Sequence, residues 1–375
     1  SMFSDLTKAL NCGLKDHIKL SCSRFETLSW LIFLMLQQGS VCLWRLAAYV
    51  PTSASTDSVR RRFYRFFQHV HLEPSVSARW LVGLLSLDDK PWTLVLDRTN
   101  WDFGKTPINI LMVSVMYRGL GIPLFWSLLP NRGNSRMPDR ISLLDQVMKA
   151  FPKARIACVI GDREFVGKPW IDWLCDNKID FILRFKENQY VQRDGRATQS
   201  ILDLAAELQI GQTRVITNWR QLGQDFDGKR DHIKLIILRL KHNELLALAC
   251  TGNPHRALAG YRNRWTIEGL FANLKTRGFN LEDTHLCQTK KLSTLLVILA
   301  MATAMAIKTG IAVDKIKPIK RKSHGRKEAN LFTLGIQTLR KIFVRPYKEA
   351  LLFLTAGLTA NVRLRKTLLR QALPT

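Results

Sequence analysis

The order of strand-like and helix-like segments after Pro91 constrains the fold of this chain more than any other feature of the sequence. Short apolar runs rich in β-branched residues alternate there with amphipathic stretches of helical period. The expected elements are strands near residues 92–99, 108–117 and 122–128, a helix at 141–151, a strand at 155–160, a helix at 169–177 and a strand at 180–185. Three strands followed by alternating helices and strands predict a mixed sheet with helices on its faces, which is an α/β fold.

The rest of the chain divides around this pattern. Residues 190–255 contain further strand-like runs before the next helical stretch, so they predict a β-rich insertion. The order on both sides of it is that expected of a ribonuclease-H-like mixed-sheet core, formed by residues 91–189 and 256–312. Helical periodicity predicts a helical domain in residues 1–90, and residues 313–375 are expected to form a basic helical C-terminal region.

The charge of the chain indicates the kind of partner it binds. Its 375 residues carry a formal net charge of +27, and the segment from Pro254 to Thr375 alone has 23 Lys and Arg against six Asp and Glu. Such an excess opposes compaction and favours a polyanionic partner. Apolar residues recur through this segment, so we favour a folded basic surface over a disordered tail, and nucleic acid over an anionic membrane.

Cysteine usage and the apolar runs indicate a cytoplasmic protein. The seven cysteines are scattered without a CxxC pair, so they lack the spacing of a zinc site and are expected to stay reduced. The longest apolar run, Leu292 to Ile307, is shorter than the roughly 20 residues that span a bilayer. We therefore expect this run to be a buried core helix.

One helix of the N-terminal region is expected to carry exposed arginines. The stretch SASTDSVRRRFYRFFQHV offers Ser55 or Thr56 as its N-cap. Its aromatic residues would pack inward while Arg61, Arg62 and Arg65 point outward. Three short helices with an arginine-lined third helix suit a DNA-binding unit, although a solvated face on an ordinary bundle helix gives the same pattern.

Two aspartates occupy positions that a structural role does not readily explain. Asp97 lies inside the apolar run Leu94–Asp97, and Asp162 directly follows the expected strand that ends at Ile160. An ionised carboxylate is costly to bury unless it is paired or bound to a metal, and the ends of strands in α/β sheets commonly carry sites. A turn, a cap or a salt bridge explains either residue alone. Converging carboxylates, however, need a divalent cation such as Mg²⁺ between them.

A third acid lies on the stretch YRNRWTIEGLFANLKTRGF. With 100° per residue, an unbroken helix places Tyr261, Arg264, Glu268 and Lys275 on one arc of about 60°. An apolar stripe lies beside this arc and consists of Ile267, Leu270, Phe271 and Leu274. The helix therefore has a core face next to a polar face, on which one carboxylate is surrounded by cationic and aromatic side chains. By itself, a glutamate at this position is more often the partner of Arg264 in a surface ion pair.

The spacing Tyr261-x2-Arg264-x3-Glu268-x6-Lys275 resembles the Y-R-E-K signature of bacterial insertion-sequence transposases of the DDE class. The strings LDRTNW and GDREFVGKPW, around Asp97 and Asp162, resemble the two aspartate motifs of that family. The segment IKRKSHGRKEANLFTLGIQTLRK resembles its basic C-terminal segment. The match covers roughly residues 90–345 in the family's motif order.

This resemblance implies a chemistry and a set of partners. Asp97, Asp162 and Glu268 would be the catalytic, metal-binding triad for two Mg²⁺ ions, with Mn²⁺ as a substitute. Tyr261, Arg264 and Lys275 would hold DNA phosphates beside them. The implied activity is cut-and-paste transposition by a bacterial, cytoplasmic protein that associates with the nucleoid when it acts. Its partners would be transposon ends and target DNA, within a homodimeric synaptic complex.

Further DNA contacts and alternatives remain open at this level. Trp265, and less strongly Trp219, are candidates to stack on a base displaced at a DNA hairpin, the intermediate that the resemblance suggests. Lys320, Arg321, Lys322 and Arg326 are expected to contact the DNA backbone. A nuclease on the same fold that joins nothing, or an inactive DNA-binding relative, would carry much of the same sequence pattern.

Overall fold

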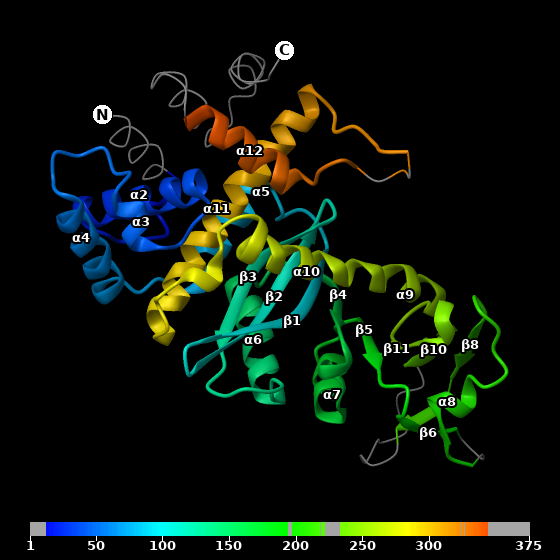
Figure 1. Ribbon diagram of the computed structural model, residues 1–375. Coiled ribbons are helices and arrows are strands. Elements are labelled where there is room, and N and C mark those ends of the chain that lie inside the picture. The colour runs from blue at the N-terminus through cyan, green and yellow to red at the C-terminus, as the bar shows by residue number, and fades with distance from the viewer. Residues whose placement is uncertain are drawn as a thin grey trace.

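The computed structural model describes residues 13–193, 197–217, 219–221, 233–323, 325 and 327–343. A mixed eight-stranded sheet forms its centre, with strand order β3-β2-β1-β4-β5-β11-β10-β8 (Figure 1). A second sheet has three strands in the order β7-β6-β9. The strands of the large sheet are β1 (Trp92–Phe103), β2 (Thr106–Tyr117), β3 (Leu120–Leu128), β4 (Ile156–Gly161), β5 (Phe181–Phe185), β8 (Thr213–Ile216), β10 (Lys234–Arg239) and β11 (Leu245–Cys250).

The first five strands have the topology of a ribonuclease-H-like core. β1 pairs antiparallel with β2, and β2 pairs antiparallel with β3. β4 then pairs parallel with β1, and β5 pairs parallel with β4. Parallel neighbours need a crossover connection, which α6 (Met137–Ala150) and α7 (Lys168–Asp176) provide. The α/β fold class expected from the sequence is confirmed, and every expected element of this part is present.

The expected insertion, residues 190–255, is only partly separate from the core sheet. β11 pairs with β5, and β10 and β8 follow it, so these strands continue the core sheet. Only β6 (Tyr190–Arg193), β7 (Gln199–Ser200) and β9 (Trp219–Gln221) form the separate small sheet. The sequence shows that these strands exist but not which neighbours they pair with, because pairing partners are far apart in the chain.

Four described helices precede the sheet: α2 (Cys22–Gln38), α3 (Leu43–Ala47), α4 (Thr56–His69) and α5 (Pro74–Leu85). Ser55 caps α4 as expected, since its hydroxyl accepts a hydrogen bond from the Ser58 amide at 3.2 Å. Phe63, Phe66 and Phe67 of α4 are buried, which confirms the inward aromatic face.

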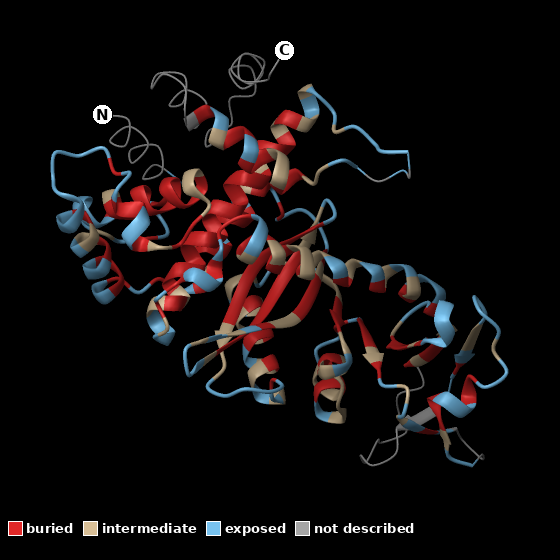
Figure 2. Cartoon of the chain, viewed as in Figure 1, coloured by how far each residue is buried: buried red, intermediate tan, exposed pale blue. Residues whose placement is uncertain are grey.

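The long helix α11 (Thr289–Ile316) joins the parts of the molecule, because it packs against α2, α5, α12 (Leu331–Phe343) and β3. Figure 2 shows α11 and the central strands almost entirely buried. α11 is long and apolar enough to cross a membrane, but 89% of its most apolar window is buried inside the protein. The expectation of a core helix is therefore confirmed. Gly310 and Gly335 allow α11 and α12 to approach closely, since a Cβ at either position would collide with the backbone of the other helix.

The polar segment at 261–277 is helical but not uniform. α9 (Pro254–Tyr261) continues through a 3₁₀ turn (Arg262–Arg264) into α10 (Trp265–Ala272), and a π-helical turn (Asn273–Arg277) follows. The expected apolar stripe is buried, and α10 lies against β1 and β3 (Figure 1). The 3₁₀ turn before α10 and the π turn after it shift the angular positions of their side chains. The helical wheel of an unbroken α-helix is therefore only approximate for Tyr261, Arg264 and Lys275.

Candidate active site

Strand register brings the two aspartates together. In the parallel pair of β1 and β4, Leu96 lies opposite Gly161. Asp97 is the next residue along β1, and Asp162 is the first residue after β4, so the two lie beside each other where β4 ends. Burial, with a smaller effect from the nearby charge of Asp162, raises the pKa of Asp97 to about 6, against the lowering effects of the Arg98 amide and of Arg264. A nearby cation would stabilise the ionised form of this buried carboxyl group.

Arg264 connects Glu268 to this pair. Its Nη1 lies 2.6 Å from Glu268 Oε1 and 3.8 Å from Asp97 Oδ2, and its side chain is only 11% exposed. Its Nε is buried and makes no hydrogen bond to any residue that the structure describes. A guanidinium group therefore occupies the space between the acid on α10 and the acid on β1.

The hydroxyl of Tyr261 donates a hydrogen bond to Asp162 Oδ1 at 3.0 Å. Burial, together with the charge of Asp162, raises the pKa of Tyr261, so its hydroxyl remains a donor. Lys275 forms an ion pair with Glu282, at 2.7 Å, and donates a hydrogen bond to the carbonyl of Asn100, at 3.3 Å. Tyr261 and Arg264 are thus bound to the acids; the pairing of Arg264 with Glu268 was one of the alternatives that the sequence offered, whereas the bond from Tyr261 to Asp162 was not expected.

Three other acids near the motifs each have their own cation. Asp102 pairs with Arg132 at 2.9 Å, Glu164 with Arg98 at 2.6 Å, and Glu282 with Lys275. Their charges are therefore compensated outside the cluster of Asp97, Asp162 and Glu268. Asp97 and Glu268, in contrast, share one cation, Arg264, and Asp162 accepts a hydrogen bond from the Tyr261 hydroxyl.

The donor set suits a hard divalent cation, since it consists of carboxylate oxygens. One of these groups is Asp97, whose pKa is raised. Arg264 shows that a positive group is accommodated between Asp97 and Glu268. Within the described ranges, no three His, Cys, Asp or Glu side chains are grouped closely enough to hold a metal ion. The residue types therefore fit a hard divalent cation, although the three acids are not grouped closely enough in the described residues to hold one.

The arginines on α4 do not all face outward. Arg61 and Arg65 are exposed. Arg62 instead turns toward α2, where its Nη2 lies 2.6 Å from Glu26 Oε2 and its guanidinium lies 4.2 Å from the centre of the Trp30 ring. Arg62 therefore ties two helices together, which differs from the outward orientation expected from the helical period.

The remaining candidates lie at the surface or outside the described side chains. Trp265 is 67% exposed, and the Arg264 guanidinium lies 5.6 Å from its ring centre. Trp219 lies on β9. Lys320, Arg321 and Lys322 are exposed on the connection between α11 and α12, which extends away from the body (Figures 1 and 2). Arg326 lies outside the described residues.

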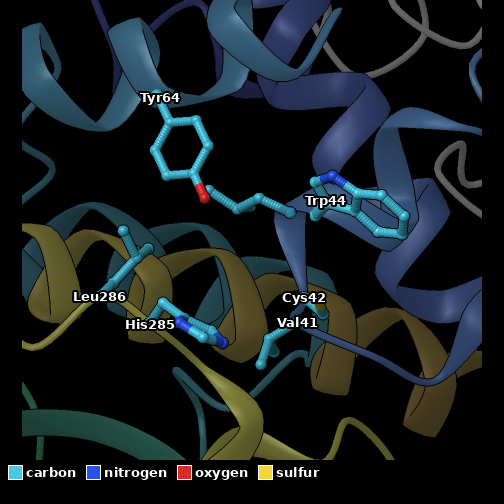
Figure 3. Close-up of a pocket in the computed structure, with 7 residues that line it drawn as sticks. Val41, Cys42, Trp44, Tyr64, His285 and Leu286 are labelled. Atoms are coloured by element: carbon cyan, nitrogen blue, oxygen red, sulfur yellow. The ribbon is translucent and has the colours of Figure 1, made fainter. Parts of the chain in front are cut away.

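A separate cavity of about 350 Å³ lies between α4 and the segment that precedes α11 (Figure 3). It is lined by Val41, Cys42, Leu43, Trp44, Tyr64, His285 and Leu286, and so by none of the three carboxylates. Tyr64 projects from α4 on one side, and His285 and Leu286 lie on the other (Figure 3). The cavity is mostly apolar in its lining, so it is not part of the carboxylate site.

Sequence reasoning missed a set of buried polar residues next to the acids. Arg98, Asn109, Ser135 and Glu164 form one hydrogen-bonded network, and Arg140 binds Ser135 from α6. The only local signal was their position, because Arg98 follows Asp97 and Glu164 lies two residues after Asp162.

Comparisons with known proteins identify a family for the chain. Residues 89–305 match the family described as transposase DDE domain. No curated protein matches the chain. Among solved structures, the chain is similar to a piggyBac transposase determined by cryo-EM in a synaptic complex with hairpin DNA, at 13% identity and a TM-score of 0.42, over 100% of this chain and 83% of that one. Because the family match covers more than half of the chain and includes Asp97, Asp162 and Glu268, this protein belongs to the transposase DDE domain family.

Proposed function

We propose that this protein is an insertion-sequence transposase of the group with the Y-R-E-K signature, which cleaves the ends of its own DNA element and joins their 3′ ends to target DNA. The observation that supports this most is the convergence of Asp97 and Glu268 on one guanidinium group, with Asp162 beside Asp97 in the strand register. An oxygen-only site of this kind, on a ribonuclease-H-like sheet in a strongly basic protein, suits metal-dependent attack on phosphodiesters.

Asp97, Asp162 and Glu268 would hold two divalent cations, Mg²⁺ or in its place Mn²⁺. When bound, such ions lower the pKa of an attacking water or 3′-hydroxyl and stabilise the leaving oxygen. The protein's own groups would orient the acids and the substrate. Tyr261 keeps Asp162 in one rotamer through its hydrogen bond, and Arg264, once released, is suited to bidentate contact with a phosphate.

The other parts of the chain would bind DNA. In this proposal the helical domain of residues 1–90 recognises transposon ends through α4, with Arg61 and Arg65 facing the DNA and Arg62 supporting the helix. Residues 91–189 and 256–312 form the catalytic core, residues 190–255 the insertion, and residues 313–375 a basic C-terminal region. Two copies would assemble with two ends in a synaptic complex in the bacterial cytoplasm.

Three variants test this function. Asp97→Ala, Asp162→Ala and Glu268→Ala should each abolish cleavage of the element's end DNA in Mg²⁺ and still shift that DNA on a gel. Asp145→Ala is the matched control, because Asp145 lies on α6 in an exposed ion pair with Lys149. A triad variant that cleaves within about tenfold of wild type, or about 1.4 kcal/mol of barrier, would exclude that residue from the site.

The same assay separates transposition from its alternatives. Ends that already carry a free 3′-hydroxyl should be joined to a target plasmid by the wild-type protein, and chelation of the divalent cation with EDTA should stop the reaction. Cleavage without joining would indicate a nuclease. DNA binding without either reaction would indicate an inactive relative.

A further inference from the structure

The connection between β3 and α6, residues 130–136, is fixed by side chains from beneath it. Asn109 on β2 is only 3% exposed, and its Nδ2 donates hydrogen bonds to the carbonyls of Asn131, at 2.8 Å, and Gly133, at 3.0 Å. Gly133 has a φ of 99°, a conformation that favours glycine. Two carbonyls of a surface turn are therefore bound by one buried amide group.

An ion pair next to the catalytic acids holds the same loop. Arg98 Nε lies 2.6 and 2.7 Å from the two oxygens of Glu164, and both side chains are largely buried. The Nη groups of Arg98 reach Asn109 Oδ1 at 2.9 Å and Asn134 Oδ1 at 3.1 Å. Glu164 Oε1 also accepts hydrogen bonds from the amide and the hydroxyl of Ser135, at 2.8 and 2.7 Å.

These contacts connect the loop to both aspartates through the backbone. Arg98 directly follows Asp97 on β1, and Glu164 is in the 3₁₀ turn that begins after Asp162. Surface loops usually run through solvent with mobile backbones, whereas this one has bonds to its backbone or side chains at residues 131, 133, 134 and 135. The loop is thus fixed in position relative to the carboxylate site.

The side chains that the loop exposes are cationic. Arg132 and Arg136 have 67% and 76% of their side chains exposed, and residues 130–136 include no acid. Arg132 pairs with Asp102 of β1 and Arg136 with Asp139 of α6. Both guanidinium groups are solvent-exposed, so water screens both ion pairs and each arginine can exchange its partner for a phosphate.

We propose that residues 131–136 form a preorganised loop that binds backbone phosphates of the DNA cleaved at the carboxylate site, through Arg132 and Arg136. Arg98 and Glu164 are positioning residues that keep this loop in its binding conformation. The inference rests on the proposed function, since it needs DNA as the substrate. A fixed loop does not lose conformational freedom when DNA binds, and this increases affinity without any further contact.

The first experiment removes both cationic groups. In the Arg132→Ala/Arg136→Ala variant, the plot of log affinity against log salt for an end duplex should lose about two units of slope, one for each phosphate contact. The control is Lys153→Ala/Arg155→Ala, which removes the same charge from exposed positions before the start of β4, at the opposite end of that strand from Asp162. Its slope should equal that of the wild type.

Equal slopes for the two double variants would overturn the inference and leave the proposed function intact, because wild-type binding and cleavage are measured in the same series. A wild-type protein that binds no DNA would overturn both. The variants change exposed residues, so both are expected to fold.

The second experiment tests the positioning role with Glu164→Gln, which removes the charge opposite Arg98 but keeps the side chain's shape. Hydrogen exchange at the Ser135 amide should become faster. Affinity for the duplex should fall severalfold with an unchanged salt slope, because both phosphate contacts still form but the loop must first be ordered. A variant with faster Ser135 exchange and wild-type affinity would show that the network supports only the fold.

Discussion

Arg264 should compete with the divalent cation for the same carboxylates. In the structure its guanidinium lies between Glu268 and Asp97, where a metal held by these acids would place positive charge. Its Nε has no hydrogen-bond partner among the described residues, so this position does not satisfy the group fully. Replacing Arg264 with Ala should therefore strengthen metal binding by the free protein, even though it weakens cleavage of DNA.

The size of the effect follows from the contact that is lost. A hydrogen bond between charged groups contributes about 1.5–3 kcal/mol. The Glu268 side chain is 38% exposed, so solvent screens the pair and the lower end of that range applies. The contact to Asp97, at 3.8 Å, adds little. We expect the affinity for Mn²⁺ in the absence of DNA to rise about tenfold, which corresponds to about 1.4 kcal/mol.

Isothermal titration calorimetry of the DNA-free protein with Mn²⁺ measures this directly. The matched control is Arg262→Ala, because Arg262 lies in the same 3₁₀ turn with its side chain exposed. The control should bind Mn²⁺ as the wild type does. If a folded Arg264→Ala variant binds Mn²⁺ no more tightly than wild type, the guanidinium does not compete with the metal. Weaker binding would mean that Arg264 instead holds the acids in their metal-binding arrangement.

Four further outcomes are expected. Tyr261→Phe removes the hydrogen bond to Asp162, so single-turnover cleavage should fall by up to about tenfold while stability, measured by urea unfolding, falls by only about 0.5–1.5 kcal/mol; unchanged cleavage would exclude the orienting role. Trp265→Ala should leave stability within about 0.5 kcal/mol, since its side chain is exposed, and should slow hairpin formation or opening but not first-strand nicking; equal loss in nicking and with pre-cleaved ends would count against a stacking role. Alanine at residues 320–322 should lower the salt slope of DNA binding by up to about three units, whereas an unchanged slope would identify a solvated loop. The folded-state pKa of Asp97 is raised to about 6 from a usual value of 3.8, so the metal-free protein should lose stability as the pH rises from about 4 to 6. In thermal unfolding, Asp97→Asn should remove this part of the pH dependence. A profile that the substitution leaves unchanged would contradict the burial of a titrating carboxylate.

Local patterns in the sequence determined much of the fold. Period-2 and period-3.6 alternation report which side chains must be buried, so the five core strands, the two crossover helices and the buried face of α10 could all be predicted. Asp97 and Asp162 could also be identified as strand-borne acids, because Asp97 interrupts an apolar run and Asp162 follows one, but their side-by-side position depends on the register of β1 and β4. The positive charge of the C-terminal segment followed from composition alone.

Contacts between distant segments were decided only by the tertiary structure. The helical period of α4 gave Arg62 an outward direction, but the actual orientation depends on Glu26 and Trp30 of α2, which the helix itself does not specify. In the same way, no local pattern shows that β11 pairs with β5, because strand pairing depends on register between segments far apart in the chain.

The site shows the same division. Its residue types and spacing can be read along one helix and two strands, but their partners cannot. Arg98 and Glu164 meet because β1 and β4 pair in one particular register, and Arg264 reaches Asp97 because α10 packs across β1. Sequence patterns record the burial and period of each segment separately, whereas ion pairs across the fold depend on the angle and register at which those segments pack. Only the folded chain fixes these quantities, and they determine whether a cation on the helix faces DNA or the acids.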